Sequence, residues 1–199
     1  MDGSPPPRLQ DRVLERALAL EPADGRWRAI LPPESSNGPT TVDPLKGGPV
    51  GGYLAGLALE AARAGLKGEA APRAVSVQYL SRPDFAPLDL EVEALRDGRS
   101  VAFARVTARQ GADTPFAAEV TFGAPGKSPE HRPSSAPAVK PPEDLADLAL
   151  PEGAVPHFTR WADYKPAGGG FPFAGGDEAR ILIWMRMKDG RPLTDARLA

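Results

Sequence analysis

The stretch "PVGGYLAGLALEAARAGLKG", residues 49–68, decides the fold because it has helical spacing and is apolar on nearly every side. Pro49 suits the first turn of a helix, and Gly68 suits its C-terminal end. Glu60 and Arg63 are the only charged residues between residues 50 and 66, so we expect the helix to be buried on most sides. The apolar positions of the helical pattern are Leu54, Leu57, Ala58, Ala61, Ala62 and Leu66.

The sequence after this helix predicts antiparallel strands that surround it. Apolar and polar residues alternate over residues 73–83, 88–95, 100–109 and 116–122, with turn residues between the runs. Asp97-Gly98 predicts a two-residue hairpin of type I′, in which both central residues have positive φ. We therefore expect an antiparallel meander after the helix.

The run at residues 100–109 has a face of unusually small apolar side chains. Small residues on both surfaces allow a helix and a strand to approach closely, so we expect this face to pack on the helix. A strongly curved antiparallel sheet around one central helix is the hotdog architecture, and the predicted fold class is α+β. The residues of this face are Ala102, Ala104, Val106 and Ala108.

The regions that flank this unit predict a second, incomplete unit. Residues 11–20 favour a helix, although a short helix followed by a strand, or a strand alone, stays open. Residues 25–33 predict a short strand, and "DLADLAL" predicts one helical turn. Residues 157–166 and 178–190 predict two strands that resemble the strands before the helix. We therefore expect a first unit at 10–123, a linker at 124–153 and the start of a second unit at 154–199.

Composition and charge exclude several classes of function. Hydrophobic residues make up 41% of the 199-residue chain, which is enough for a globular core. The absence of cysteine excludes disulfides, thiolate catalysis and cysteine-ligated metal. A net charge of −2 without a basic cluster argues against nucleic-acid binding, and no run is long enough for a membrane span. We expect a soluble, cytoplasmic protein.

Three motifs resemble the acyl-CoA thioesterase II family, whose members are double-hotdog proteins. They are "GGYLAGLALEAA" (51–62), "VSVQYLSRP" (75–83) and "VEALRDGRSVAFARVTARQG" (92–111). The third is the most specific because it is a long patterned string. "ILIWMRMKDGRPL" (181–193) resembles the strand that opens the second hotdog, so the resemblance extends over about residues 12–193.

The resemblance implies hydrolysis of acyl-CoA thioesters to a fatty acid and CoA, with no metal or nucleotide cofactor. In the family, an Asp, a Gln and a Ser or Thr orient the hydrolytic water, and they lie largely in the second hotdog. Those positions would fall after residue 199, so none can be assigned here. We therefore expect a fragment of a longer enzyme or a shortened relative that uses a partner's half.

The glycine-rich entry to the helix is the first candidate site. Thioester hydrolysis needs a polarised carbonyl, and unpaired amides at a helix N-terminus can polarise it. Glycine also lets a ligand approach the backbone closely. The alternative is a loop-to-helix entry in which small residues serve packing. The candidate substrate-binding residues here are Gly48, Gly51, Gly52 and Tyr53.

Side chains outside this entry are further candidates. Glu60 could act as a catalytic base, but a surface glutamate beside Arg63 is the stronger interpretation. Gln78, Tyr79 and Arg82 could border the acyl or CoA channel, or could be ordinary strand residues. Arg105 and Arg109 could meet a CoA phosphate, although a solvated outer face is the stronger interpretation. Asp43 precedes a proline and predicts a turn.

Two hypotheses follow for the function. The first is an enzyme, or part of one, that hydrolyses acyl-CoA with an activated water. The second is a non-catalytic hotdog module that binds acyl-CoA or supports a partner subunit. In both, the ligand is acyl-CoA, and a homodimer is expected because an unpaired edge strand is a liability. The serines lie in loops without a nucleophile-elbow sequence, so serine-hydrolase chemistry is not expected.

Overall fold

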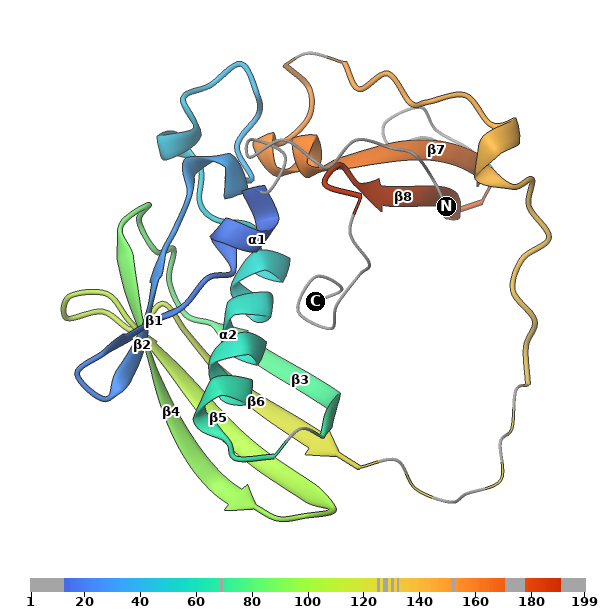
Figure 1. The fold of residues 1–199 in the computed structure, drawn as a ribbon. Coiled ribbons are helices and arrows are strands. Elements are labelled where there is room, and N and C mark those ends of the chain that lie inside the picture. The colour runs from blue at the N-terminus through green and yellow to red at the C-terminus, as the bar shows by residue number, and fades with distance from the viewer. Residues whose placement is uncertain are drawn as a thin grey trace.

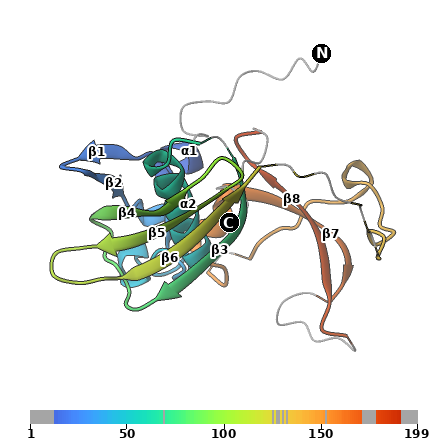
Figure 2. The ribbon, with the colours of Figure 1, turned by 90° about the horizontal axis from the view of Figure 1, so that it is seen from below.

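The computed structural model describes residues 13–68, 70–124, 126, 129, 131, 133–151, 153–170 and 178–190. A six-stranded antiparallel sheet curves around the helix α2, and two further strands form a separate sheet (Figures 1 and 2). The elements are α1 (Val13–Ala17), β1 (Glu21–Ala23), β2 (Arg26–Ile30), α2 (Gly51–Gly65), β3 (Ala71–Tyr79), β4 (Pro87–Asp97), β5 (Val101–Arg109), β6 (Phe116–Gly123), β7 (Ala162–Gly169) and β8 (Ile181–Met187).

The large sheet has the strand order β1-β2-β4-β5-β6-β3. Strands β4, β5 and β6 form a meander as predicted, but the run at residues 73–83 does not start it: the strand there, β3, pairs with β6 and closes the far edge of the sheet. The predicted α+β class and the hotdog arrangement of a curved sheet on one central helix are therefore confirmed. The position of β3 matters for the site, because it brings the end of this strand beside the start of α2.

The small apolar face of β5 packs against α2, as predicted. Leu57 and Ala58 of the helix and Val106 and Ala108 of the strand all have 0% of their surface exposed, and they belong to one core cluster. The approach of α2 to the neighbouring strand β4 is close as well, since a methyl group added to Gly65 would lie 2.6 Å from Val92 Cγ1. The core therefore depends on small residues at this contact.

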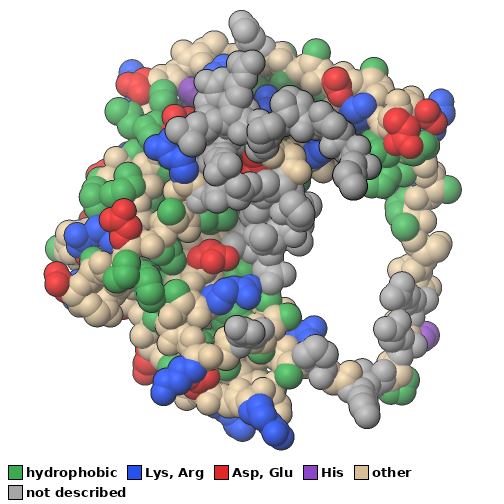
Figure 3. All heavy atoms as spheres, viewed as in Figure 1, with side chains coloured by type: hydrophobic (Ala, Val, Ile, Leu, Met, Phe, Trp, Pro, Cys, Tyr) green, Lys and Arg blue, Asp and Glu red, His purple; other side chains and the backbone are tan. Residues whose placement is uncertain are grey.

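The outer face of the sheet carries ion pairs. Arg28 Nε lies 2.6 Å from Asp89 Oδ1, and this hydrogen bond lowers the pKa of Asp89 below its ordinary value. Figure 3 views the molecule from the other side, that of α2, and shows both signs of charge interspersed on that face as well. The predicted solvated role of Arg105 and Arg109 agrees with their contacts, because both pair with acids across the strands. Further pairs are Arg26–Glu91, Arg105–Glu93, Arg105–Glu119 and Arg109–Glu91.

The prediction of a type I′ turn at Asp97-Gly98 is wrong. Asp97 pairs with Ala102, so four residues separate the partners, and neither Asp97 nor Gly98 has positive φ. The two-residue turn lies instead at Asp24-Gly25, where both φ angles are positive (48° and 77°) and Ala23 pairs with Arg26. The register at the strand ends, rather than the dipeptide, decides which loop forms.

The flanking regions are partly as predicted. The described part of residues 11–20 contains the short helix α1, as the pattern favours, and the strand β1 begins just after this range, at Glu21. Strands β7 and β8 pair antiparallel, but residues 157–161 form a 3-10 helix, His157–Trp161, rather than the start of a strand. The helical turn expected in "DLADLAL" (144–150) is wrong. The 3-10 helix Pro142–Asp144 ends at the first residue of this stretch, and residues 145–150 are not helical. The division into units at 10–123, 124–153 and 154–199 remains a prediction.

The packing of β5 on α2 makes a prediction about stability. We expect Ala104→Leu to lower the free energy of unfolding by about 1–3 kcal/mol, because overpacking forces the helix away from the sheet. Ala104 is 1% exposed. The measurement is urea denaturation followed by circular dichroism. Phe103→Leu, on the outer face of the same strand, is the control and should change stability little; equal losses for both variants would contradict the packing argument.

Candidate functional site

The first turn of α2 leaves its backbone amides without a capping side chain. Val50 is the N-cap residue and offers no side-chain hydrogen bond. Gly52 is exposed and Gly51 half-buried, so solvent or a ligand reaches the backbone here. Helix-entry amides carry the positive end of the helix dipole. This end of the helix can therefore bind and polarise a carbonyl oxygen.

The loop before the helix is held by its own hydrogen bonds. Gly48 N donates to Asn37 Oδ1 (3.0 Å), and Asn37 N donates to Gly48 O (2.8 Å). Arg82 lies against Gly48, where an added methyl group would be 2.7 Å from Arg82 Cγ, and Arg82 Nη1 donates to Lys46 O (3.2 Å). The structure thus brings Gly48 and Arg82 together, but both hold the loop. Asp43 caps the turn at Leu45 N (3.0 Å), as the sequence predicted.

Tyr79 fixes the start of α2 to the end of β3. Its hydroxyl donates to Gly51 O (2.6 Å). A methyl group added to Gly51 would lie 3.0 Å from the hydroxyl oxygen of Tyr79. Burial raises the pKa of Tyr79 above its ordinary value. Gln78, the preceding residue, is exposed on the opposite face of the strand and is not brought to this cluster. Tyr79 was a candidate from its place after the helix, and what its position in the sequence did not indicate is that its hydroxyl bonds the backbone of Gly51.

Tyr53 is buried, and its hydroxyl is already used. The Tyr53 hydroxyl donates to Ala17 O (2.7 Å), which ties α2 to α1. Burial raises the pKa of Tyr53 well above its ordinary value. The ring meets Trp161 edge-on, with centroids 5.8 Å apart and an interplanar angle of 81°. Tyr53 can therefore contact a ligand through its ring.

An apolar cavity of about 190 Å³ lies at the entry of α2. Its lining comes from α1, the start of α2, the 3-10 helix His157–Trp161, β7 and β8. The indole Nε1 of Trp161 is buried and has no hydrogen-bond partner among the described residues. Two of the predicted site residues, Gly52 and Tyr53, line this cavity. The full lining is Leu14, Leu18, Val50, Gly52, Tyr53, Phe158, Trp161, Ala162, Tyr164, Met185 and Met187.

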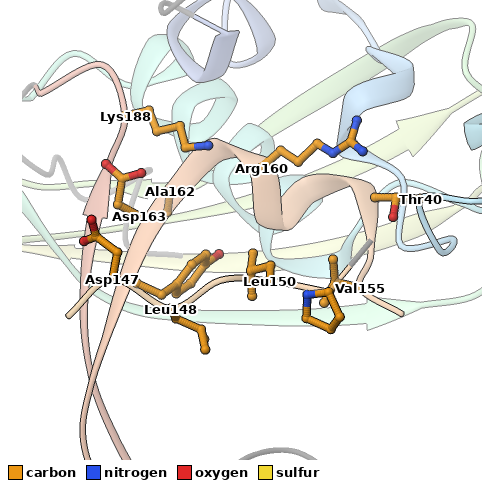
Figure 4. A pocket seen from close by; sticks show the side chains of 11 residues that line it. Thr40, Asp147, Leu148, Leu150, Val155, Arg160, Ala162, Asp163 and Lys188 are labelled. Carbon is orange, nitrogen blue, oxygen red and sulfur yellow. The ribbon is translucent and has the colours of Figure 1, made fainter. Parts of the chain in front are cut away.

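A second cavity, of about 330 Å³, lies beside β7 and has a charged lining (Figure 4). Figure 4 shows the carboxylates of Asp147 and Asp163 close together at one end and the Arg160 side chain toward the other. Tyr164 lines both cavities, and burial, followed by the charge of Asp163, raises its pKa. Because both signs of charge surround it, this cavity has no preference for anions. Its other lining residues are Thr40, Leu148, Leu150, Pro151, Val155, Ala162 and Lys188.

Glu60 is placed away from both cavities. It is half-buried on α2 and lies eight residues after Gly52, or about 12 Å along the helix axis. It lines neither cavity. Its catalytic role remains a prediction. Within the described ranges, no group of three potential metal ligands comes together, and no helix is long and apolar enough to cross a membrane.

A family model and solved structures support the resemblance seen in the sequence. Residues 39–123 match the family model of the acyl-CoA thioesterase N-terminal domain. This segment contains α2 and the strands from β3 to β6. No curated protein matches the chain. The resemblance to acyl-CoA thioesterases is therefore confirmed over residues 39–123.

Three solved structures are similar along most of the chain. A hot dog fold protein of unknown function from Alicyclobacillus acidocaldarius is 26% identical over 94% of this chain and 66% of its own, with a TM-score of 0.81. A candidate thioesterase from Novosphingobium aromaticivorans is 27% identical over 90% and 69%, with a TM-score of 0.74. An acyl-CoA thioesterase II from Mycobacterium marinum, 22% identical over 92% and 62% with a TM-score of 0.65, shares the fold. The chain spans about two thirds of the length of these structures.

The hydrogen bond of the Tyr53 hydroxyl leads to a prediction about the stability of the protein and its pH dependence. We expect Tyr53→Phe to lower the free energy of unfolding by roughly 1–3 kcal/mol, because the buried Ala17 carbonyl loses its donor. Burial raises the pKa of Tyr53 in the folded state above the ordinary value of 10.0. The contribution of Tyr53 should therefore be complete below about pH 10 and should shrink as the pH rises further.

Denaturant unfolding of both proteins at pH 8 and above pH 10 measures this effect. Tyr79→Phe is the matched control, since Tyr79 is 52% exposed and water can replace its bond to Gly51 O. We expect the control to lose less stability than Tyr53→Phe. Equal losses, or a Tyr53 contribution that grows with alkaline pH, would contradict the assignment.

Proposed function

We propose that this chain, whose residues 39–123 match the acyl-CoA thioesterase N-terminal domain, takes part in the hydrolysis of acyl-CoA thioesters to a free acid and CoA. The observation that carries the proposal is the apolar cavity that adjoins the uncapped first turn of α2. An acyl-CoA has an apolar chain next to a carbonyl. The apolar cavity fits the chain, and the first-turn amides of α2 beside it fit the carbonyl. Val50, Gly52 and Tyr53 contribute to both.

The geometry divides the reaction into two parts. Binding of the acyl chain and polarisation of the thioester carbonyl fit residues of this chain, because first-turn amides favour negative charge on the oxygen. Activation of water needs a general base or an orienting polar group. The lining of the apolar cavity contains no carboxylate among the described residues. We propose that the groups that activate water come from a second hotdog unit, as the family resemblance implies.

The size of the cavity favours short acyl chains. Its volume of about 190 Å³ lies below the ~300–1,000 Å³ typical of small-molecule sites. The second candidate function, a module that binds acyl-CoA without hydrolysing it, is favoured by the lack of a carboxylate in the same lining. The two candidates predict the same binding and differ in turnover.

The oligomeric state of the protein and its location in the cell remain predictions. A homodimer is supported by β3, which lies at one end of the six-stranded sheet and leaves a backbone edge that another strand can pair with. We propose no metal or nucleotide cofactor, in line with the family resemblance, and a cytoplasmic location.

Leu18 offers a test of the acyl site because it is half-buried and lines the apolar cavity. We expect hydrolysis of acyl-CoAs of increasing length, followed with a thiol reagent, to show a preferred chain length. Leu18→Ala enlarges the cavity and should move this preference roughly two carbons longer, whereas Leu18→Phe fills it and should move the preference shorter. Each methylene of the acyl chain that becomes buried contributes about 0.8 kcal/mol. Leu80→Ala, at a residue that is 62% exposed, is the control and should leave the preference unchanged.

The same series separates the two candidate functions. Turnover supports the thioesterase, whereas calorimetric binding of acyl-CoA without release of thiol supports the binding module. A chain-length preference that Leu18→Ala and Leu18→Phe leave unchanged would show that the acyl chain does not occupy this cavity.

Glu60→Gln tests the helix carboxylate. We expect the variant to keep its turnover within about twofold of the parent, because Glu60 lines neither cavity and lies about 12 Å along the helix from Gly52. The measurement is the rate of thiol release at saturating acyl-CoA. A loss of 100-fold or more, typical of a removed general base, would instead assign the base to Glu60.

A further inference from the structure

A third cavity lies at the C-terminal end of α2, and basic side chains surround it. It has a volume of about 390 Å³ and is formed by the end of the helix, the loop that joins β4 to β5, and residues of β5 and β6. In Figure 3, Lys and Arg side chains lie at this lower end of the molecule. Arg63, Lys67 and Arg99 line the cavity, with Asp97 as the one acid among its described lining residues. We call it the basic cavity.

The cations of the basic cavity come from two separate elements. Arg63 and Lys67 lie at the end of α2, where the negative end of the helix dipole favours positive charge. The dipole does not account for Arg99, which the loop between β4 and β5 brings to the same cavity. The Arg96 side chain lies against this loop, since a methyl group added to Gly98 would be 3.3 Å from Arg96 Nε. The helix and the loop together therefore concentrate positive charge at one place.

Asp97 does not balance this charge. Its Oδ2 accepts a hydrogen bond from the backbone amide of Lys67 (3.3 Å), so it faces the three lining cations as a single carboxylate. The outer face of the sheet differs, because Arg105 alone lies near two carboxylates, those of Glu93 (3.5 Å) and Glu119 (3.1 Å). A concave surface with an excess of one sign of charge attracts ions of the opposite sign. The basic cavity is therefore suited to an anion.

The wall behind the cations is apolar. The guanidinium carbon of Arg63 lies 5.8 Å from the centre of the Phe122 ring, and this cation–π contact holds the charge at the wall. Leu66 and Ala102 are further apolar lining residues. The volume of the cavity falls within the ~300–1,000 Å³ typical of small-molecule sites. The occupant that fits this lining is a small organic molecule with an anionic group.

We propose that the basic cavity binds a phosphate group of a small organic molecule. A guanidinium offers parallel donors that match the oxygens of phosphate, and an ammonium adds a compact positive charge. The site lies at the opposite end of α2 from the glycine-rich entry, and the 15 residues of the helix separate the two ends by about 22 Å. The proposal therefore goes beyond the proposed function. The phosphate can belong to a free organic phosphate or to CoA, and the cavity would recognise the same group in both.

Calorimetric titration of the full chain with pyrophosphate tests the site. The salt concentration is about 0.1 M, at which charges more than about 10 Å away are largely screened. We expect binding at one site. In the double variant Lys67→Gln, Arg99→Gln the affinity should fall about 10-fold or more, because each charged donor to phosphate is lost. Both residues are exposed, so the substitutions leave the core intact, which circular dichroism checks.

The matched control is the double variant Arg26→Gln, Arg105→Gln. It removes the same net charge from the outer face of the sheet, where both arginines pair with acids. Because these charges lie outside the basic cavity, the affinity for pyrophosphate should change by less than about twofold. The control separates a local site from general attraction by the charge of the protein.

A second titration distinguishes the two sources of phosphate. The probe is CoA without an acyl chain, added to the protein alone and to the protein saturated with pyrophosphate. An unchanged affinity for CoA assigns the basic cavity to a separate organic phosphate. Competition between the two probes that disappears in Lys67→Gln, Arg99→Gln assigns it to a phosphate of CoA.

Three outcomes overturn the proposal. They are no binding of pyrophosphate, an affinity that Lys67→Gln, Arg99→Gln leaves unchanged, and equal losses in this variant and in Arg26→Gln, Arg105→Gln. None of them bears on the proposed function, because pyrophosphate has no acyl chain. A failure of the proposed function shows instead as the absence of both turnover and binding of acyl-CoA.

Discussion

The close contact between α2 and the alanine face of β5 is the constraint on which the rest of the structure depends. Leu57 and Ala58 belong to one fully buried core cluster with Val106 and Ala108, and the alanines on both surfaces let the helix lie near the sheet. The contact fixes the axis of α2. It therefore also fixes where the helix begins, which is the end that carries the glycines.

The start of α2 is held from several sides by polar side chains that are used for this purpose. Tyr79 bonds Gly51 O, Tyr53 bonds Ala17 O, and Asn37 bonds both polar atoms of Gly48. These bonds come from β3, α1 and the entry loop, so the backbone is positioned before any ligand arrives. Such preorganisation is what stabilisation of a developing charge requires. What remains for a ligand is the set of first-turn amides, which no side chain caps.

The cavity beside this helix start depends on elements far apart in the sequence. Backbone hydrogen bonds from His157 N to Gly38 O (3.1 Å) and from Phe158 N to Ser36 O (3.2 Å) attach the 3-10 helix to the loop before α2. Trp161 then reaches Tyr53, and β7 and β8 complete the apolar lining. The cavity proposed to hold the acyl chain is therefore lined both by residues near the start of α2 and by the strands β7 and β8, and residues 39–123 alone would form only one side of it.

The sequence by itself determined the elements and their buried faces, because periodicity is local: the helix at Gly51–Gly65, the alternating strands and the small face of β5 follow from spacing alone. Asp97-Gly98 and Asp24-Gly25 show its limit, since the same dipeptide forms different loops according to the register of the paired strands. Only the tertiary structure decided that Tyr79 reaches the helix start while Gln78 does not, and that Trp161 lies beside Tyr53. Those contacts depend on strand order and on the docking of distant segments, and no spacing along the chain encodes either.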